Sequence, residues 1–199
     1  VQLMEGVEDI PGVALNEGVS WDWESFPEYL DSIGKKNYAM DIGAMIGHGP
    51  IRSYVMGMDR CQGKEEASDG EIAEMAEITK EAIEAGALGF STSRTYLHRD
   101  KSGEYVPGTE ASAKEMRTIA NSIADLGKGT LEIVSDWMDQ DIELDWIKEF
   151  VEKSDRTLTY AQTGGNPVET WKYCEENFSK GVKIRPQFPG RPTGMLFSL

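Results

Sequence analysis

Residues 86–100 read GALGFSTSRTYLHRD, and this stretch decides the fold class. A helical pattern ends at Gly86, a short apolar run follows, and Ser, Thr, Arg, Tyr and His side chains come directly after it. The order is typical of a strand that carries polar side chains at its C-terminal end. In parallel α/β proteins, that end of the strand is where binding and catalytic groups lie.

On both sides of this stretch, strand-like and helix-like segments alternate. Strands are expected over residues 37–46, 87–91, 130–134, 156–161 and 182–188. Helices are expected over residues 69–85, 109–126, 139–154 and 167–180, because these segments combine apolar stripes with start and stop signals. One more helix is expected over residues 21–33. Strands mostly about 30 residues apart are typical of βαβ units.

Two architectures share this pattern, an open doubly wound sheet and a (β/α)8 barrel. No G-x-G-x-x-G follows a strand and no phosphate-binding G-x-x-x-x-G-K-[ST] is present, which favours the barrel. A full barrel needs roughly 250 residues, so the 199 residues predict a partial (β/α)8 barrel. The chain begins with Val1 and ends in an apolar stretch, and we expect it to be incomplete at both ends. We expect a single domain over 1–199, with a helical extension over 1–36 and successive βα units over 37–199.

Composition excludes several classes of partner. The net charge is −15, from 35 acidic and 20 basic residues, and this charge repels phosphate backbones and anionic membrane surfaces. We therefore expect no nucleic-acid or membrane partner. Cys61 and Cys174 are too few for a disulfide framework and lack the spacing of a metal motif, which favours a reducing, cytoplasmic location.

Four side chains near the expected strand ends are candidates for binding substrate. His48 lies between two glycines and is either a pocket histidine or one that satisfies backbone groups in a turn. Ser91 follows the second strand. Arg94 and Tyr96 together suit a substrate carboxylate, unless Arg94 pairs with an acid of the chain such as Glu132 or Asp136.

Glu132 is the candidate metal ligand. It lies in mid-strand among apolar neighbours, where a carboxylate needs a paired charge or a metal, unless strand alternation simply turns it toward a polar layer. Two histidines cannot build a three-histidine zinc site, and neither H-E-x-x-H nor H-x-H occurs. Further polar residues follow the later strands: Ser135, Asp136, Tyr160, Gln162, Gln187 and Arg191. The charged loop 99–109 is either a lid or a solvated loop.

Several blocks, in order along nearly the whole chain, carry a family resemblance. They are MEGVEDIPG at 4–12, WDWESFPEYL at 21–30, HGPIR at 48–52 followed by VMG at 55–57, EAGALGFSTSR at 84–94, EIVSD at 132–136 and GRP at 190–192. Together they resemble the N-acyl-D-amino-acid deacylase family of the amidohydrolase superfamily.

The resemblance implies a metal-dependent barrel flanked by a small β domain. It implies that zinc-activated water attacks the amide of a small-molecule N-acyl-D-amino acid. Tyr96 matches a tyrosine that contacts substrate in the family, and His48 matches a histidine of its His-Gly block. The family's H-x-H pair and metal-binding cysteine lie before the segment that matches Val1, its late aspartate lies after Leu199, and Cys61 matches none of them.

This sequence also departs from the family pattern. Family histidines that bind metal end the strands matching 131–135 and 158–162, where this chain has Glu132, Ser135 and Gln162. Either Glu132 is a ligand or the metal site is rearranged. We expect an amide hydrolase, with the 199 residues inactive alone and prone to associate through exposed strand edges. A non-catalytic binding protein that lost the ligands and an amidohydrolase for a cyclic amide remain alternatives.

Overall fold

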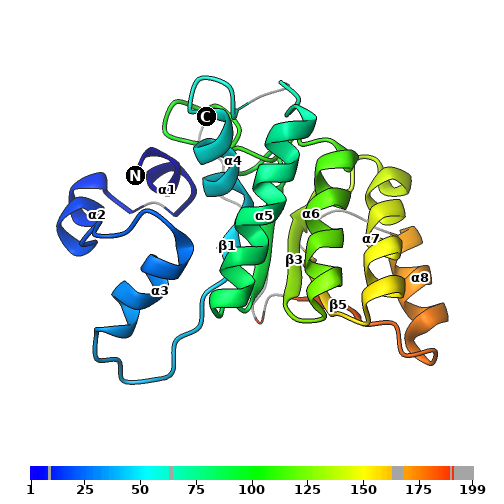
Figure 1. The fold of residues 1–199 in the computed structure, drawn as a ribbon. Coiled ribbons are helices and arrows are strands. Elements are labelled where there is room, and N and C mark those ends of the chain that lie inside the picture. Colours follow the sequence, from blue (N-terminus) through cyan, green and yellow to red (C-terminus); the bar gives the residue numbers. More distant parts are fainter. Residues whose placement is uncertain (9, 63–64, 163–167, 189, 191–199) are drawn as a thin grey trace.

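A computed structural model describes residues 1–8, 10–62, 65–162, 168–188 and 190 (Figure 1). Its centre is a parallel sheet of five strands in the order β1-β2-β3-β4-β5. The strands are β1 (Ile46–Gly47), β2 (Gly89–Arg94), β3 (Thr130–Ser135), β4 (Leu158–Ala161) and β5 (Ile184–Gln187). Each strand pairs with the one before it in sequence, so the sheet grows in one direction.

The crossover helices lie side by side on one face of this sheet (Figure 1). They are α5 (Asp69–Ala85), α6 (Ala113–Leu126), α7 (Gln140–Ser154) and α8 (Val168–Phe178). A doubly wound sheet reverses its strand order and carries helices on both faces. Sequential strands with their helices on one face are instead part of a (β/α) barrel, which confirms the predicted fold class.

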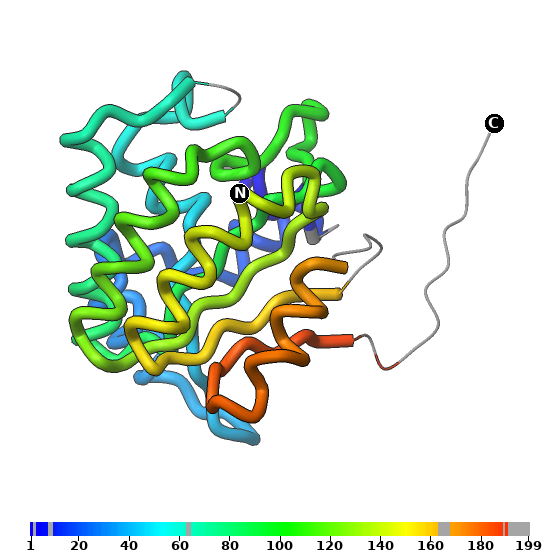
Figure 2. The backbone as a smooth tube through the Cα atoms, turned by 90° about the vertical axis from the view of Figure 1, so that its right-hand side faces the viewer, coloured from blue at the N-terminus to red at the C-terminus, as the bar shows by residue number. Residues whose placement is uncertain are grey.

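The two faces of the sheet differ in chemistry. The helix-covered face is apolar and buried, with core side chains from four strands: Phe90, Leu131, Ile133, Leu158, Tyr160 and Ile184. The opposite face, here called the open face, carries a row of mostly polar residues in register: Ser91 beside Glu132, Glu132 beside Thr159, and Thr159 beside Arg185. Figure 2 shows the strands to one side of the helix layer.

Local signals explain the helix boundaries. Helix α5 begins behind Ser68, which accepts a hydrogen bond from the backbone of Glu71 while the Glu71 carboxylate accepts one from the backbone of Ser68. Its bounds match the predicted ones. Helix α6 begins four residues later than expected, because Ser112 rather than Thr109 caps it. Helix α7 begins behind Asp139, whose side chain accepts from the Ile142 N–H at 3.1 Å.

The N-terminal region contains three helices, α1 (Gln2–Glu8), α2 (Gly12–Gly18) and α3 (Phe26–Gly34). Only α3 was expected, and it begins five residues after Trp21 because Ser25 and Glu28 form its capping box. The strand expected over 37–46 is reduced to Ile46–Gly47, where the chain pairs with β2. A helix that the sequence did not predict, α4 (His48–Met56), follows it directly.

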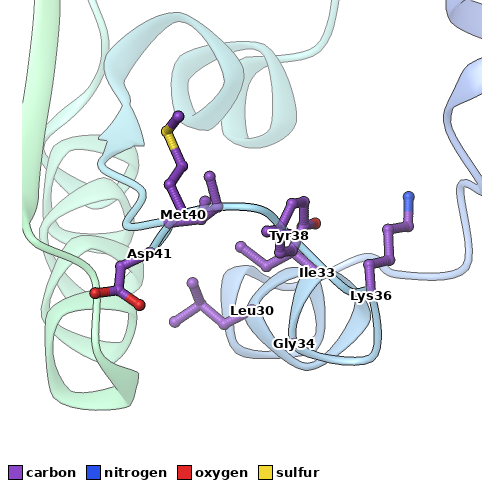
Figure 3. Close-up of a pocket in the computed structure, with 8 residues that line it drawn as sticks. Leu30, Ile33, Gly34, Lys36, Tyr38, Met40 and Asp41 are labelled. Carbon is purple, nitrogen blue, oxygen red and sulfur yellow. The ribbon is translucent and has the colours of Figure 1, made fainter.

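A shallow hollow of about 370 Å³ lies near the N-terminal ends of the strands, between α3 and the segment that leads into β1 (Figure 3). Leu30 and Ile33 of α3 line it together with Tyr38 and Met40 of that segment. Barrel enzymes place their chemistry at the opposite edge, so this hollow is not the candidate site. In the described residues, no helix is both long and apolar enough to cross a membrane.

Candidate functional site

The C-terminal edge of β2 carries the candidate site. The chain turns sharply over residues 95–98, with the His98 N–H donating to the Thr95 carbonyl oxygen at 3.4 Å. Asp136, just after β3, holds this turn: its two carboxylate oxygens accept from the Thr95 hydroxyl at 2.7 Å and the Tyr96 N–H at 2.8 Å. These hydrogen bonds join the segment after β2 to the segment after β3, and the two segments together form one rim at this edge of the sheet.

A cavity of about 310 Å³ opens beside this rim. Its wall includes Arg94 and Tyr96 from the end of β2, Ser135 from β3, and the first turns of α6 and α7 at Ser112 and Asp139. The Tyr96 side chain is 37% exposed, and its ring meets the Tyr105 ring edge-on at 4.9 Å. The cavity therefore lies where the barrel fold places binding groups.

Arg94 is held by the protein itself. Its Nε donates to Glu143 of α7 at 2.5 Å, and its Nη1 donates to the backbone carbonyls of Ala111 at 2.8 Å and Gly108 at 3.4 Å. Both charged side chains are about nine-tenths buried. The sequence left open a pairing of Arg94 with an acid of the chain, and the structure shows such a pair, with Glu143 in place of Glu132 or Asp136.

His48 lies on the helix-covered side of β2 and is 1% exposed. Its Nδ1 is 2.8 Å from the Thr92 hydroxyl and its Nε2 is 2.7 Å from Glu115 of α6. Burial lowers the pKa of His48, more than the neighbouring carboxylate raises it. The imidazole is therefore neutral near pH 7, donating from Nε2 to Glu115 and accepting from Thr92.

Arg52 completes this buried cluster. It pairs with the second oxygen of Glu115, and its Nε and Nη2 donate to the carbonyls of Cys61 at 3.1 Å and Glu65 at 2.6 Å. Burial raises the pKa of Glu115, but the hydrogen bonds from His48 and Arg52 and the charge of Arg52 outweigh it and hold the pKa below its ordinary value. Since His48 is neutral, the opposite charges of Glu115 and Arg52 cancel, and the buried cluster carries no net charge.

Ser91 and Glu132 lie next to each other on the open face. The Glu132 carboxylate is exposed and accepts from the Thr159 hydroxyl at 3.4 Å. Strand alternation thus turns Glu132 away from the core, as the alternative interpretation of this residue expected. Among the residues that the structure describes, no three His, Cys, Asp or Glu side chains are placed to hold a metal ion.

The other polar residues at the strand ends do not gather in one place. Ser135 and Tyr160 face the helices and are buried, and the side-chain oxygen of Gln162 accepts from Trp171 of α8 at 3.0 Å. Arg191 lies outside the described residues. The loop 99–109 is not simply solvated: its last part is buried, and Gly108 lies directly on the His48 ring.

Sequence reasoning missed Glu115 and Glu143, the two acids that partner His48 and Arg94. Both occur in the first turns of helices, where an acidic residue is ordinarily explained by capping. The only usable signal was their position in the sequence. The first turn of a helix that follows a parallel strand lies near the C-terminal ends of the strands once the βα units assemble.

The known proteins that resemble this chain match only part of it, and only a small part of their own length. No protein-family model matches the chain. A D-aminoacylase of Alcaligenes xylosoxydans xylosoxydans is 37% identical over 83 residues, which are 41% of this chain and 16% of that protein. An uncharacterized protein of Mycobacterium tuberculosis is 26% identical over 111 residues, 53% of this chain and 18% of that protein. The matches thus span less than a fifth of the curated relatives' length.

Solved structures share the fold. A D-aminoacylase with a binuclear metal centre superposes with a TM-score of 0.63 at 21% identity, over 82% of this chain and 33% of that one. A second D-aminoacylase structure, described as defining a novel subset of amidohydrolases, gives a TM-score of 0.61 at 20% identity over the same shares. These structures share the fold of the chain, and together with the sequence match over 41% of its length they support its resemblance to D-aminoacylases.

Proposed function

We propose that the protein containing this chain hydrolyses the amide bond of N-acyl amino acids, with preference for the D enantiomers, and that this chain supplies part of the substrate-binding rim. The 37% identity to a D-aminoacylase is the observation that carries the proposal. The position of the cavity at the C-terminal edge of β2 and β3 supports it, since that edge carries the active sites of barrel enzymes.

Within this proposal the four binding candidates have different tasks. Tyr96 lines the cavity and is partly exposed, so its hydroxyl can donate to a substrate carboxylate or carbonyl. Ser91 faces the open side of the sheet, where the rest of a substrate would pass. Arg94 and His48 act indirectly, by supporting the loop beside the cavity. Arg94 holds residues 108–111 by its hydrogen bonds, and the His48 ring lies against Gly108.

The described residues do not fit a metal centre. Glu132 lies on the open face, whereas His48 is buried behind β2 with both ring nitrogens occupied, and Nδ1 of His98 is bonded to Ser93. A metal, zinc in our proposal, therefore needs ligands other than these. Its role would be to activate water, and the residues described here bind and orient the substrate.

The test is hydrolysis by the full-length protein of matched N-acetyl-D- and N-acetyl-L-amino acids, before and after chelation. We expect release of the free D-amino acid that stops when metal is removed. Tyr96→Phe should raise KM about tenfold with kcat little changed, since it removes one hydrogen bond to bound substrate. Tyr54→Phe is the matched control, because Tyr54 is an exposed tyrosine on α4 that bonds Glu24 instead.

A non-catalytic binding protein remains a second candidate because the described residues hold no metal-ligand group. It predicts that the full-length protein binds an N-acetyl-D-amino acid in titration calorimetry without releasing product and without stoichiometric metal.

A further inference from the structure

Strand β2 carries two hydroxyl–imidazole pairs, one on each face. On the helix-covered face, Thr92 and His48 are sealed in the interior. On the open face, the Ser93 hydroxyl lies 2.7 Å from Nδ1 of His98, and both residues are partly exposed. This second pair is therefore accessible. The proposed amide hydrolysis uses neither Ser93 nor His98, so the pair has no role in it.

The position of His98 is fixed by the turn that precedes it. Residues 95–98 are closed by the His98 N–H to Thr95 carbonyl bond, and Asp136 holds the turn through Thr95 and Tyr96. On the far side, the His98 carbonyl oxygen accepts from Val106 N–H at 3.3 Å. The backbone of His98 is thus held on both sides and its imidazole is bonded to a serine of the paired strand β2, the kind of preorganisation that a catalytic pair requires.

A serine within hydrogen-bond reach of an imidazole is the arrangement of an activated nucleophile. We propose that Ser93 accepts an acyl group with His98 as its general base, an activity separate from any metal-dependent hydrolysis. The ligand class is an activated acyl compound, such as an aryl ester. Asp136 is a positioning residue in this proposal, because it holds the turn and does not touch the imidazole.

The chemistry balances with water as the second reactant. The Ser93 oxygen bonds to the acyl carbon while its proton passes to Nδ1 of His98, and the bond from the acyl carbon to the leaving oxygen breaks. The leaving group takes the proton from His98, or it departs as an anion and His98 releases the proton to solvent, so that Nδ1 is free again. Water then attacks the acyl carbon, its proton passes to Nδ1, the ester bond to Ser93 breaks, and the serine oxygen regains a proton from His98.

The experiment treats the protein with p-nitrophenyl acetate, with and without a chelator, and follows p-nitrophenolate release and the acetylated peptides by mass spectrometry. We expect a burst of about one equivalent, an acetyl group on Ser93, and the same burst after chelation. Insensitivity to chelation separates this activity from the proposed amide hydrolysis, so either can fail alone.

Three variants complete the test. Ser93→Ala should abolish the burst, and His98→Gln should slow it roughly 100-fold, the size of a general-base contribution. Ser102→Ala is the matched control and should behave as the parent protein, because Ser102 is exposed and its hydroxyl donates to Asp100 instead of an imidazole. Acetyl groups on His98 or lysines with Ser93 unmodified, or an unchanged burst in correctly folded Ser93→Ala, would overturn the proposal.

Discussion

His48 Nε2 lies 2.7 Å from Oε1 of Glu115, and this contact joins the first residue of α4 to the first turn of α6 inside the protein. The histidine of the His-Gly-Pro block therefore supports the fold from behind β2 instead of facing the open side of the sheet. Burial keeps His48 neutral although Glu115 lies beside it, and Glu115 stays charged against Arg52. Protonation of either His48 or Glu115 disturbs this arrangement, so the cluster is sensitive to acid.

The free energy of unfolding should fall as the pH drops below about 6.5. Burial lowers the pKa of His48, so the unfolded chain binds a proton there at a pH where the folded chain does not, and acid favours unfolding. Glu115 acts in the same direction at lower pH, since its pKa is also below its ordinary value and its stabilisation is lost when it is protonated. Urea denaturation between about pH 8 and about pH 5 measures this.

His48→Gln is the control for that prediction. It keeps a side chain that can bond Glu115 and removes the titrating group, so the loss of stability just below about pH 6.5 should become smaller. A parent chain with the same unfolding free energy throughout this range would contradict the assignment of a neutral, buried His48.

Removing the Glu115 charge should destabilise the protein strongly. In Glu115→Gln the buried Arg52 guanidinium keeps its two backbone carbonyl partners but loses its counter-charge. Breaking a buried pair in this way costs about 3–5 kcal/mol, measured as the shift in urea unfolding. Glu77→Gln, which removes an exposed pair with Lys80, should leave stability almost unchanged. Equal stability of both variants would argue against a charged buried pair.

Gly108→Ala should disrupt the support of the rim loop by His48. Gly108 has φ +100°, and an added Cβ would lie 2.6 Å from Nδ1 of His48. Gly103→Ala is a matched comparison, because Gly103 has φ +88° but nothing within 4 Å of the added carbon. Both variants share the backbone strain of roughly 1–2 kcal/mol, so the additional loss in Gly108→Ala reports the contact with His48. Equal losses in the two thermal melts would show that the contact does not matter.

Arg94 and Glu143 should behave as one unit. A double-mutant cycle with Arg94→Ala and Glu143→Gln should give a coupling free energy of about 1–3 kcal/mol in urea unfolding, because their ion pair is nearly buried. Additive single effects would mean that the guanidinium is independent of α7 and free to bind a substrate carboxylate directly. In the full-length protein we expect Arg94→Ala mainly to raise KM, through the displaced 108–111 segment.

The order of strands and helices was predictable because each βα unit carries local signals. The apolar stripe of α5, with Gly86 at its end, determines that helix fully. The alternation of β3 likewise gives the two possible directions for Glu132, of which the structure shows the exposed one. Helix α4 was not predictable, because it starts at once after a two-residue strand and Gly49 and Pro50 lie in its first turn.

Contacts between distant residues limited what could be inferred about the site. His48 and Glu115 are 67 residues apart, and Arg94 and Glu143 are 49 apart, so no local pattern links either pair. Strand direction indicates that such groups gather at one edge, but the face that each side chain takes depends on register. The family resemblance identified Tyr96 and His48 as residues of interest without indicating that one lies at the cavity and the other in the interior.

The most direct test of the proposed function is the rate of amino-acid release by the full-length protein from paired N-acetyl-D- and N-acetyl-L-amino acids, with Tyr96→Phe measured beside the parent. We predict release of the D-amino acid at a kcat/KM well above that of its enantiomer, lowered about tenfold by Tyr96→Phe through KM. No release from either enantiomer by metal-replete protein, or full activity in Tyr96→Phe, would contradict the account.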